Sequence, residues 1–362
     1  MAVEGALPEA KLKAGARNLL CRCAGLRAGD RVTILHEPPD AGYYDPGLPA
    51  VLARVAGELG IEARLREVPV VADAGAIAAR PGDLTGGGNA IFLARIGDQL
   101  RFAPESGRGR VSVCYALDRR MLASGFGTAD YAAFLAIRDR VQALLSQAGH
   151  IHVTCPAGTD FAGAAPGFDA GPDVTIRRFP MPTITPIPAG GFSGRVALPG
   201  FLTGTGSRFY EPYSVTFEGR VLAEFEGRRL IGFFGSASDV RRAEAQYDRV
   251  AALFGIERDL VHSWHPGIHP GCAYGRPAAE DLMRWGGAAF GNPRLLHFHT
   301  CGDYAPGEIS WNVVDATIRV DGVAVWEAGR LIIDRVPGSR EILDEHPCAR
   351  AAFAQPALEI GL

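Results

Sequence analysis

Hydrophobic and polar positions in the first 148 residues follow two periodicities in turn. Apolar side chains recur at helical spacing in three segments, residues 10–26, 48–59 and 130–149. Short apolar runs of strand length lie between them, at residues 31–37, 89–95 and 112–117. Strands that alternate with helices favour a parallel sheet, because a parallel pair needs a long crossover connection. We therefore predict a doubly wound α/β domain over residues 1–148.

The pattern changes at about residue 150. Alternating apolar and polar residues now turn at glycine or at Asp-Gly, and the pair Asp321-Gly322 between two such runs predicts a hairpin. One amphipathic helix, residues 236–256, interrupts the strands, with Asp239 or Ser238 as a possible cap. We predict a strand-rich α+β domain over residues 149–362, so that the whole chain belongs to the α/β class.

Composition narrows the class of protein. A chain of 362 residues is long enough for two domains, and 47% hydrophobic with 21% charged residues is typical of a soluble globular protein. A net charge of −3 gives no electrostatic reason to bind nucleic acid or an anionic membrane. There is no apolar run of membrane-spanning length and no apolar stretch of a signal peptide. We expect a cytoplasmic protein of bacterial composition, without nucleic-acid or membrane partners.

Two common kinds of site find no support. No glycine-rich GxGxxG motif follows a predicted strand, so we expect no bound nucleotide. The seven cysteines form no CxxC pair, which disfavours a structural zinc site and predicts reduced thiols.

Histidines gather in two stretches, VHSWHPGIHPGCAYG (261–275) and LLHFHTCGDYAPGEISWNVVD (295–315). Five of the nine histidines lie there: His262, His265, His269, His297 and His299. A strand through His297 and His299 would place both rings on one face, with Glu308 within reach. Two histidines and one carboxylate can hold a mononuclear iron ion. We predict metal ligands among His262, His265, His297, His299 and Glu308; histidines with ordinary structural hydrogen bonds are the alternative.

Several segments resemble, in the same order, those of a known family. They are GLRAGDRVTI (25–34), HVTCPAGTDF (152–161), GIHPGC (267–272), LLHFHTCGDY (295–304) and ATIRVDGVAVWEAGRL (316–331). The chain resembles the aminopeptidase T family of metallo-aminopeptidases and its iron-dependent relative, 2,5-dihydroxypyridine 5,6-dioxygenase. The resemblance implies a metal site, a catalytic tyrosine and a homodimer. His297 matches the histidine of the family, and Tyr304 matches its tyrosine.

The carboxylate ligands of the family are largely replaced. Phe201 or Leu202 stands where the resemblance implies one glutamate, and Ser263 stands near the other. The H-x-D motif of the family falls on Glu308-Ile309-Ser310. Because two divalent ions need several anionic ligands, these replacements disfavour a dinuclear aminopeptidase. The dioxygenase has a histidine ligand near Ser263, which draws attention to His265 and His262.

The favoured hypothesis is a divergent, mononuclear metal-dependent enzyme. One divalent ion, Fe(II) or Zn, would be held by His265, by His297 or His299, and by Glu308. Tyr304 would act as an acid or base or would orient the substrate, a small aromatic or peptide-like molecule.

The alternative hypothesis is a catalytically inactive protein that binds a peptide or metabolite for a biosynthetic pathway. Trp264, Phe298 and Trp311 lie near the histidines in the sequence and would suit stacking on such a ligand. A retained metallo-aminopeptidase is the weaker alternative.

Overall fold

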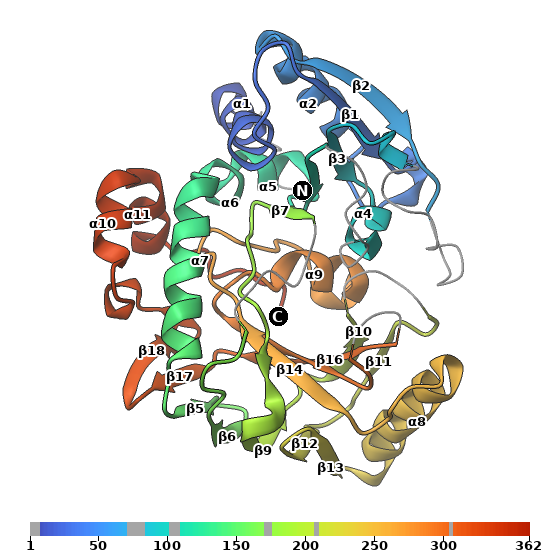
Figure 1. The fold of residues 1–362 in the computed structure, drawn as a ribbon. Coiled ribbons are helices and arrows are strands. Elements are labelled where there is room, and N and C mark those ends of the chain that lie inside the picture. Colours follow the sequence, from blue (N-terminus) through green and yellow to red (C-terminus); the bar gives the residue numbers. More distant parts are fainter. Residues whose placement is uncertain (1–7, 71–83, 101–108, 170–175, 206–209, 304–306) are drawn as a thin grey trace.

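The computed structural model describes residues 8–70, 84–100, 109–169, 176–205, 210–303 and 307–362. Its first sheet is parallel and has five strands in the order β2-β1-β3-β4-β7. These strands are β1 (Arg31–His36), β2 (Glu62–Glu67), β3 (Ala90–Leu93), β4 (Val111–Cys114) and β7 (Arg177–Phe179). The helices around it include α1 (Glu9–Arg17), α2 (Leu48–Glu58), α4 (Arg95–Gln99), α5 (Arg119–Ala123) and α6 (Gly125–Thr128) (Figure 1). The predicted α/β class, with a parallel sheet near the N-terminus, is confirmed.

Two antiparallel sheets follow. The first has six strands in the order β11-β10-β16-β15-β14-β8: β8 (Ile187–Pro188), β10 (Phe201–Gly204), β11 (Ser214–Thr216), β14 (Val261–Pro266), β15 (Leu295–Thr300) and β16 (Ile309–Val314). The other has eight strands in the order β13-β12-β9-β6-β5-β17-β18-β19: β5 (Ile151–Thr154), β6 (Asp160–Gly163), β9 (Phe192–Ala197), β12 (Leu222–Glu226), β13 (Arg229–Phe234), β17 (Thr317–Val320), β18 (Val323–Glu327) and β19 (Arg330–Leu331). Asp321 and Gly322 connect β17 to β18, so the predicted hairpin is confirmed.

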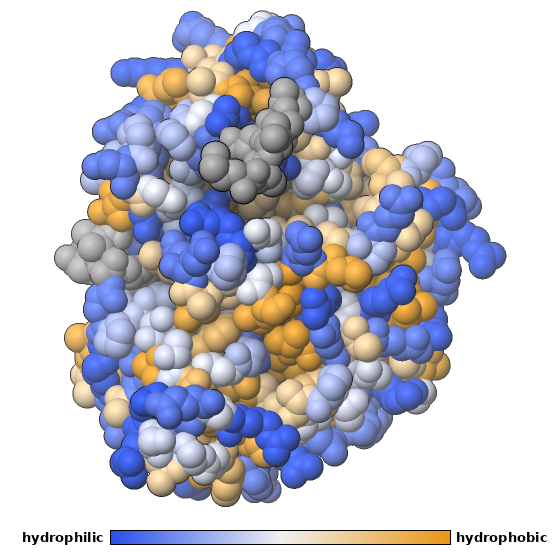
Figure 2. Space-filling view, turned by 180° about the vertical axis from the view of Figure 1, so that it is seen from behind, coloured by the Kyte–Doolittle hydropathy of each residue, from blue (hydrophilic) through white to orange (hydrophobic). Residues whose placement is uncertain are grey.

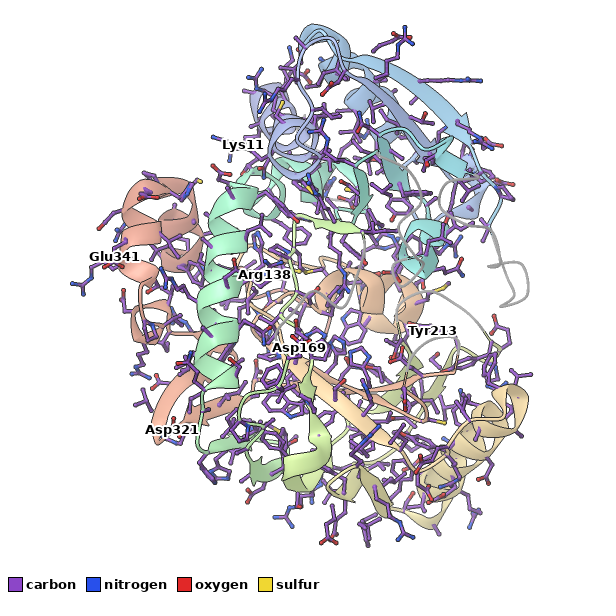
Figure 3. All side chains as sticks on the ribbon, viewed as in Figure 1. Lys11, Arg138, Asp169, Tyr213, Asp321 and Glu341 are labelled. Atoms are coloured by element: carbon purple, nitrogen blue, oxygen red, sulfur yellow. The ribbon has the colours of Figure 1, made fainter. Side chains whose placement is uncertain are left out.

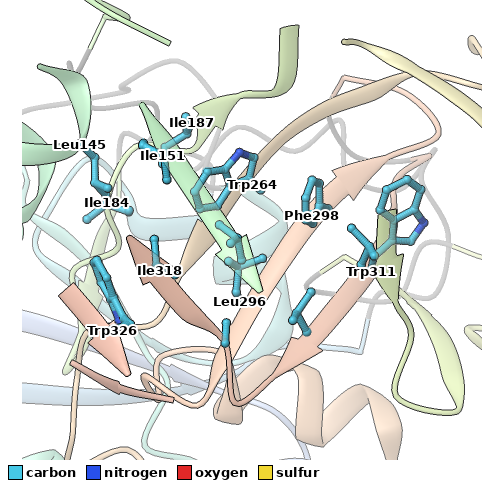
Figure 4. Close-up of a cluster of buried hydrophobic side chains, with 14 of the residues drawn as sticks. Leu145, Ile151, Ile184, Ile187, Trp264, Leu296, Phe298, Trp311, Ile318 and Trp326 are labelled. Atoms are coloured by element: carbon cyan, nitrogen blue, oxygen red, sulfur yellow. The ribbon is translucent and has the colours of Figure 1, made fainter. Parts of the chain in front are cut away.

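Aromatic side chains fill the space between the two antiparallel sheets. Trp264, Phe298 and Trp311 are fully buried on one face of the six-stranded sheet (Figure 4). Phe161, from the facing sheet, lies 5.4 Å from Trp264 and 5.2 Å from Phe298, measured between ring centres. Phe225 lies 5.5 Å from Phe298 in the same way. Because successive residues of a strand point to opposite faces, this core leaves the other face of β14, β15 and β16 available for polar residues.

Segments on each side of the predicted boundary at residue 148 pack with the sheets on the other side. Helix α7 (Tyr131–Ser146) precedes it, yet Phe134 and Leu145 pack into the core of the antiparallel sheets. Strand β7 follows it, yet completes the parallel sheet beside β4. Consequently the two sheet systems are tied together by segments on either side of the boundary.

The remaining helices lie around these sheets. They are α8 (Ala237–Phe254), α9 (Leu282–Ala289), α10 (Ser339–Glu345) and α11 (Pro347–Ala354). Helix α9 lies between the parallel and the six-stranded sheets, and α10 and α11 lie beside α7 (Figure 1). The cap of α8 is Ser236, whose hydroxyl accepts the backbone N–H of Asp239; neither Ser238 nor Asp239 fills the expected role. The carboxylate of Asp239 instead accepts the backbone N–H of Glu218.

The rear face of the molecule is mostly hydrophilic, with a band of apolar residues across its middle (Figure 2). Among the described helices, we find none with both the length and the apolar character that a membrane span requires.

Candidate metal centre

The register between β14 and β15 brings three histidines together. The two strands are antiparallel, and His265 stands opposite His297. His299 lies two residues further along β15 and therefore on the same face as His297, as the H-x-H spacing predicts. Trp264 and Phe298, the residues next to these histidines, point into the aromatic core on the other face. The strand alternation thus separates an apolar face from a face that carries imidazoles.

The three imidazole rings converge. Their centres are 4.0 Å apart for His265 and His297, 5.0 Å for His297 and His299, and 5.6 Å for His265 and His299. One nitrogen of each ring lies within 4.8 Å of the chosen nitrogens of the other two. His265 and His297 are buried, with 3% and 7% of their surface exposed. Three such nitrogens form a donor set that fits Zn or Fe(II).

Glu308 lies behind this group. Its Oε1 is 2.8 Å from Nδ1 of His299, which places the Nδ1–H donor on the carboxylate and leaves Nε2 as the nitrogen that carries a lone pair. Nε2 of His299 and Nδ1 of His265 are both buried and have no hydrogen-bond partner among the described residues. A carboxylate that holds the far nitrogen of a histidine is typical of metal sites. The sequence predicts Glu308 as a ligand; in the structure its carboxylate contacts His299 and is not among the three converging groups.

The surroundings of His265 favour the neutral form of its ring. Burial lowers the pKa of His265 well below its ordinary value, and the charges of His299 and Arg178 lower it further. Burial, followed by the charge of His299, also lowers the pKa of His262. Neutral imidazole is the form that binds metal ions, so the environment of His265 keeps its ring in a form that can bind one at neutral pH.

The other predicted polar residues of the site are placed differently. His262 does not join the converging nitrogens; its Nδ1 lies 2.8 Å from Oγ of Ser263, and it lines a second pocket that also contains Asp169 and Glu308. Asp169 is labelled in Figure 3, near the centre of the molecule. His299 lines both pockets. Tyr304 lies outside the described residues.

The aromatic residues expected to contact a ligand lie in the core instead. Trp264, Phe298 and Trp311 are fully buried, and none of them lines either pocket beside the histidines. Trp311 donates its indole N–H to the hydroxyl of Tyr247 over 2.6 Å. The reason is the two-residue period of the strands: a residue next to one that faces the pocket points to the opposite face of the sheet, here the aromatic core. A position near a histidine in the sequence is therefore no indication of a position near it in the pocket.

The pocket above the histidines lies between the six-stranded sheet and the end of the parallel sheet. Its floor continues across β10 and β16 with Thr203, Ser310 and Asn312. Its opposite wall includes Phe290, which follows α9, and Arg178 from β7. The alternation of ISWNVV in β16 could have indicated Ser310 and Asn312, but no local pattern could have indicated Arg178.

Asp98 and Tyr115 also line this pocket, and each follows a strand of the parallel sheet, β3 and β4 respectively. The Tyr115 hydroxyl donates a hydrogen bond to the carboxylate of Asp98. Ligand sites in parallel sheets lie at the carboxyl ends of the strands, and this pair lies at that end.

His269 has a structural role. It is fully buried and stacks on Phe134, with ring centres 3.7 Å apart and planes at 10°. Its Nδ1 accepts the backbone N–H of Gly271 over 3.1 Å. Burial lowers the pKa of His269 to about 3, so the ring is neutral. Of the five clustered histidines, this one is a core residue.

Comparison with known proteins gives a structural relationship. No family model matches the chain, and no curated sequence matches it. The structure of 2,5-dihydroxypyridine dioxygenase from Pseudomonas putida KT2440 is similar over 92% of this chain and 99% of the other, with a TM-score of 0.55 and 16% identity. The structure of AmpT from Thermus thermophilus is similar over 90% and 100%, with a TM-score of 0.50 and 13% identity. The chain therefore has the fold of these two proteins, as its resemblance to aminopeptidase T and the dioxygenase predicted.

Proposed function

We propose that this protein is a mononuclear metal-dependent enzyme that acts on a small aromatic molecule. His265, His297 and His299 would hold one divalent ion, Fe(II) or Zn. The convergence of their three nitrogens, beside the Glu308 carboxylate on His299, carries the proposal. The name of the similar dioxygenase supports an aromatic substrate rather than a peptide.

The bound ion would supply Lewis-acid chemistry at an oxygen of the substrate. The residues of the chain prepare the site for it. Glu308 keeps the proton of His299 on Nδ1 and fixes the direction of the ring. His265 and His297 are buried, and electrostatic interactions are stronger in such surroundings than in water.

A second ion finds less support. Two-metal hydrolases hold their ions with bridging carboxylates. Among the residues that the structure describes, the group of converging ligand atoms contains three histidines and no carboxylate. This donor set favours one ion and argues against the aminopeptidase alternative.

Metal analysis combined with ligand variants tests the proposal. The protein is purified without a chelator, loaded with Fe(II) or Zn under exclusion of air, and freed of excess ion. We expect about one ion per chain in the wild type. His297→Ala should lose this ion, because removing a residue that binds the ion directly costs more affinity than removing a residue that only hydrogen-bonds to a ligand. His150→Ala, a surface histidine, is the matched control and should keep the ion. A wild-type protein that never retains stoichiometric metal would favour the inactive binding protein instead.

A further inference from the structure

Buried polar atoms without a partner are concentrated in the pocket above the histidines. Besides His265 and His299, they include Nε of Arg178, Oγ1 of Thr205 and Nδ2 of Asn312. Each of these atoms lacks a hydrogen-bond partner among the described residues. A buried polar group without a partner is costly, so a ligand is expected to satisfy several of them at once.

Arg178 carries a positive charge for which the described part of the chain provides no counterion. Its guanidinium donates through one terminal nitrogen to the hydroxyl of Thr183, and this is the one hydrogen bond that the described side chains and backbone offer it. No carboxylate among those residues forms an ion pair with Arg178. Thr183 therefore fixes the guanidinium but does not neutralise it, which leaves the charge for an anion.

Among the described residues that line the pocket, the acidic one already accepts a hydrogen bond from another side chain. Asp98 is the one carboxylate among the described residues that line the pocket, and it accepts the hydroxyl of Tyr115. Arg178 and Asn312 both line the cavity, and each has a buried N–H donor without a partner among the described residues. Donors with one unpaired cation match a carboxylate, which the planar guanidinium binds with two parallel hydrogen bonds.

Phe290 provides an apolar surface beside these donors. Its ring stands edge-on to Tyr115, with centres 5.6 Å apart and planes at 85°. It is also perpendicular to His297, with centres 5.7 Å apart and planes at 90°. A flat ring can pack on such an aromatic wall, next to the three histidines.

We infer that the substrate is a small aromatic acid whose carboxylate binds Arg178, whose ring packs on Phe290, and which receives a further hydrogen bond from Asn312. The inference specifies the substrate class of the proposed enzyme and rests on that function for the chemistry at the ring. The binding of the carboxylate itself depends on Arg178 and not on an ion.

Calorimetry with metal-free protein tests this inference separately from the metal site. Benzoate and its neutral analogue benzamide are titrated into chelator-treated wild type, Arg178→Gln and Arg178→Lys. We expect benzoate to bind the wild type at least about tenfold more tightly than benzamide. Arg178→Gln should abolish this preference, and Arg178→Lys should keep part of it because lysine retains the charge without the planar fork.

Arg177→Gln is the matched control. Arg177 precedes Arg178 on β7, points the other way and donates to the backbone oxygen of Cys23. This variant should bind benzoate as the wild type does. Equal binding of benzoate and benzamide by the wild type, or unchanged benzoate affinity in Arg178→Gln, would overturn the inference while leaving the metal count untouched. Tighter binding of glycyl-phenylalanine than of benzoate would also overturn it, in favour of a peptide.

Discussion

His299 and Glu308 face each other at the edge of the candidate metal centre, with Nδ1 of the imidazole 2.8 Å from Oε1 of the carboxylate. Both side chains are largely buried, so water competes little for this hydrogen bond. The contact determines which nitrogen of His299 points at the other two histidines. We therefore regard Glu308 as a positioning residue.

Replacing Glu308 should weaken the binding of the ion without abolishing it. We predict that Glu308→Ala lowers metal affinity by about 10–100-fold, and that Glu308→Gln lies at the mild end because its amide oxygen can still accept the Nδ1–H. Competition with a coloured chelator measures both affinities. If Glu308→Ala removed the ion as completely as His297→Ala, Glu308 would be a ligand after all. If it changed nothing, the hydrogen bond would have no role in binding.

Replacing Trp311 should lower the stability of the protein and leave its affinity for the ligand unchanged. Trp311→Phe keeps an aromatic ring in the core but removes the indole donor to Tyr247, so we predict a loss of about 1–3 kcal/mol in the free energy of unfolding. Chemical denaturation measures this loss. Benzoate affinity of the folded variant should stay unchanged, because the side chain faces away from the pocket.

A matched control for this variant is Leu253→Ala. Leu253 lies on α8 with 57% of its surface exposed, and its replacement should change stability by less than about 0.5 kcal/mol. A Trp311→Phe protein with normal stability and weakened benzoate binding would return Trp311 to the ligand site.

His269 should make stability sensitive to acid. Burial lowers its pKa from 6.5 to about 3, so the unfolded chain takes up this proton at a higher pH than the folded protein does. The stabilisation is complete above pH 6.5 and is lost progressively as the pH falls toward 3. At pH 5 the loss amounts to about 2 kcal/mol relative to pH 7.5.

The variant His269→Phe lacks this titration. Comparing the free energies of unfolding at pH 7.5 and pH 5, we predict that the variant gains about 2 kcal/mol relative to the wild type on acidification. Any effect of the larger ring on packing cancels in this difference. His150→Gln, on the surface, should follow the wild type at both pH values. A pH-independent difference between His269→Phe and the wild type would show that His269 titrates normally.

The local pattern of the sequence was sufficient to predict many of the helices and strands and to place two of the three histidines on one face. The H-x-H spacing on β15 places His297 and His299 on one face because a strand has a period of two. The same period places Trp264 and Phe298, which are adjacent to histidines in the sequence, on the opposite face of the sheet. The alternation was available in the sequence, but which face is buried depends on the sheet packed against it.

Contacts between residues far apart in the chain could not be predicted from the sequence. Arg178 reaches the pocket because β7 joins the parallel sheet beside β4, more than sixty residues earlier in the chain. The distinction between Glu308 as a ligand and Glu308 as a partner of His299 depends on side-chain geometry within a few ångströms. Neither relationship leaves a periodic or spacing signal in one sequence.

X-ray absorption spectroscopy of protein loaded with Zn or Fe(II) measures how many ions bind and which atoms hold them. We predict one ion with three imidazole nitrogens, at about 2.0–2.1 Å for Zn, and light atoms in the remaining positions. We also predict loss of the imidazole signal in His265→Ala and His297→Ala. A metal–metal vector at about 3.5–4 Å, or a bound ion without histidine scattering, would rule out a mononuclear site held by these three histidines.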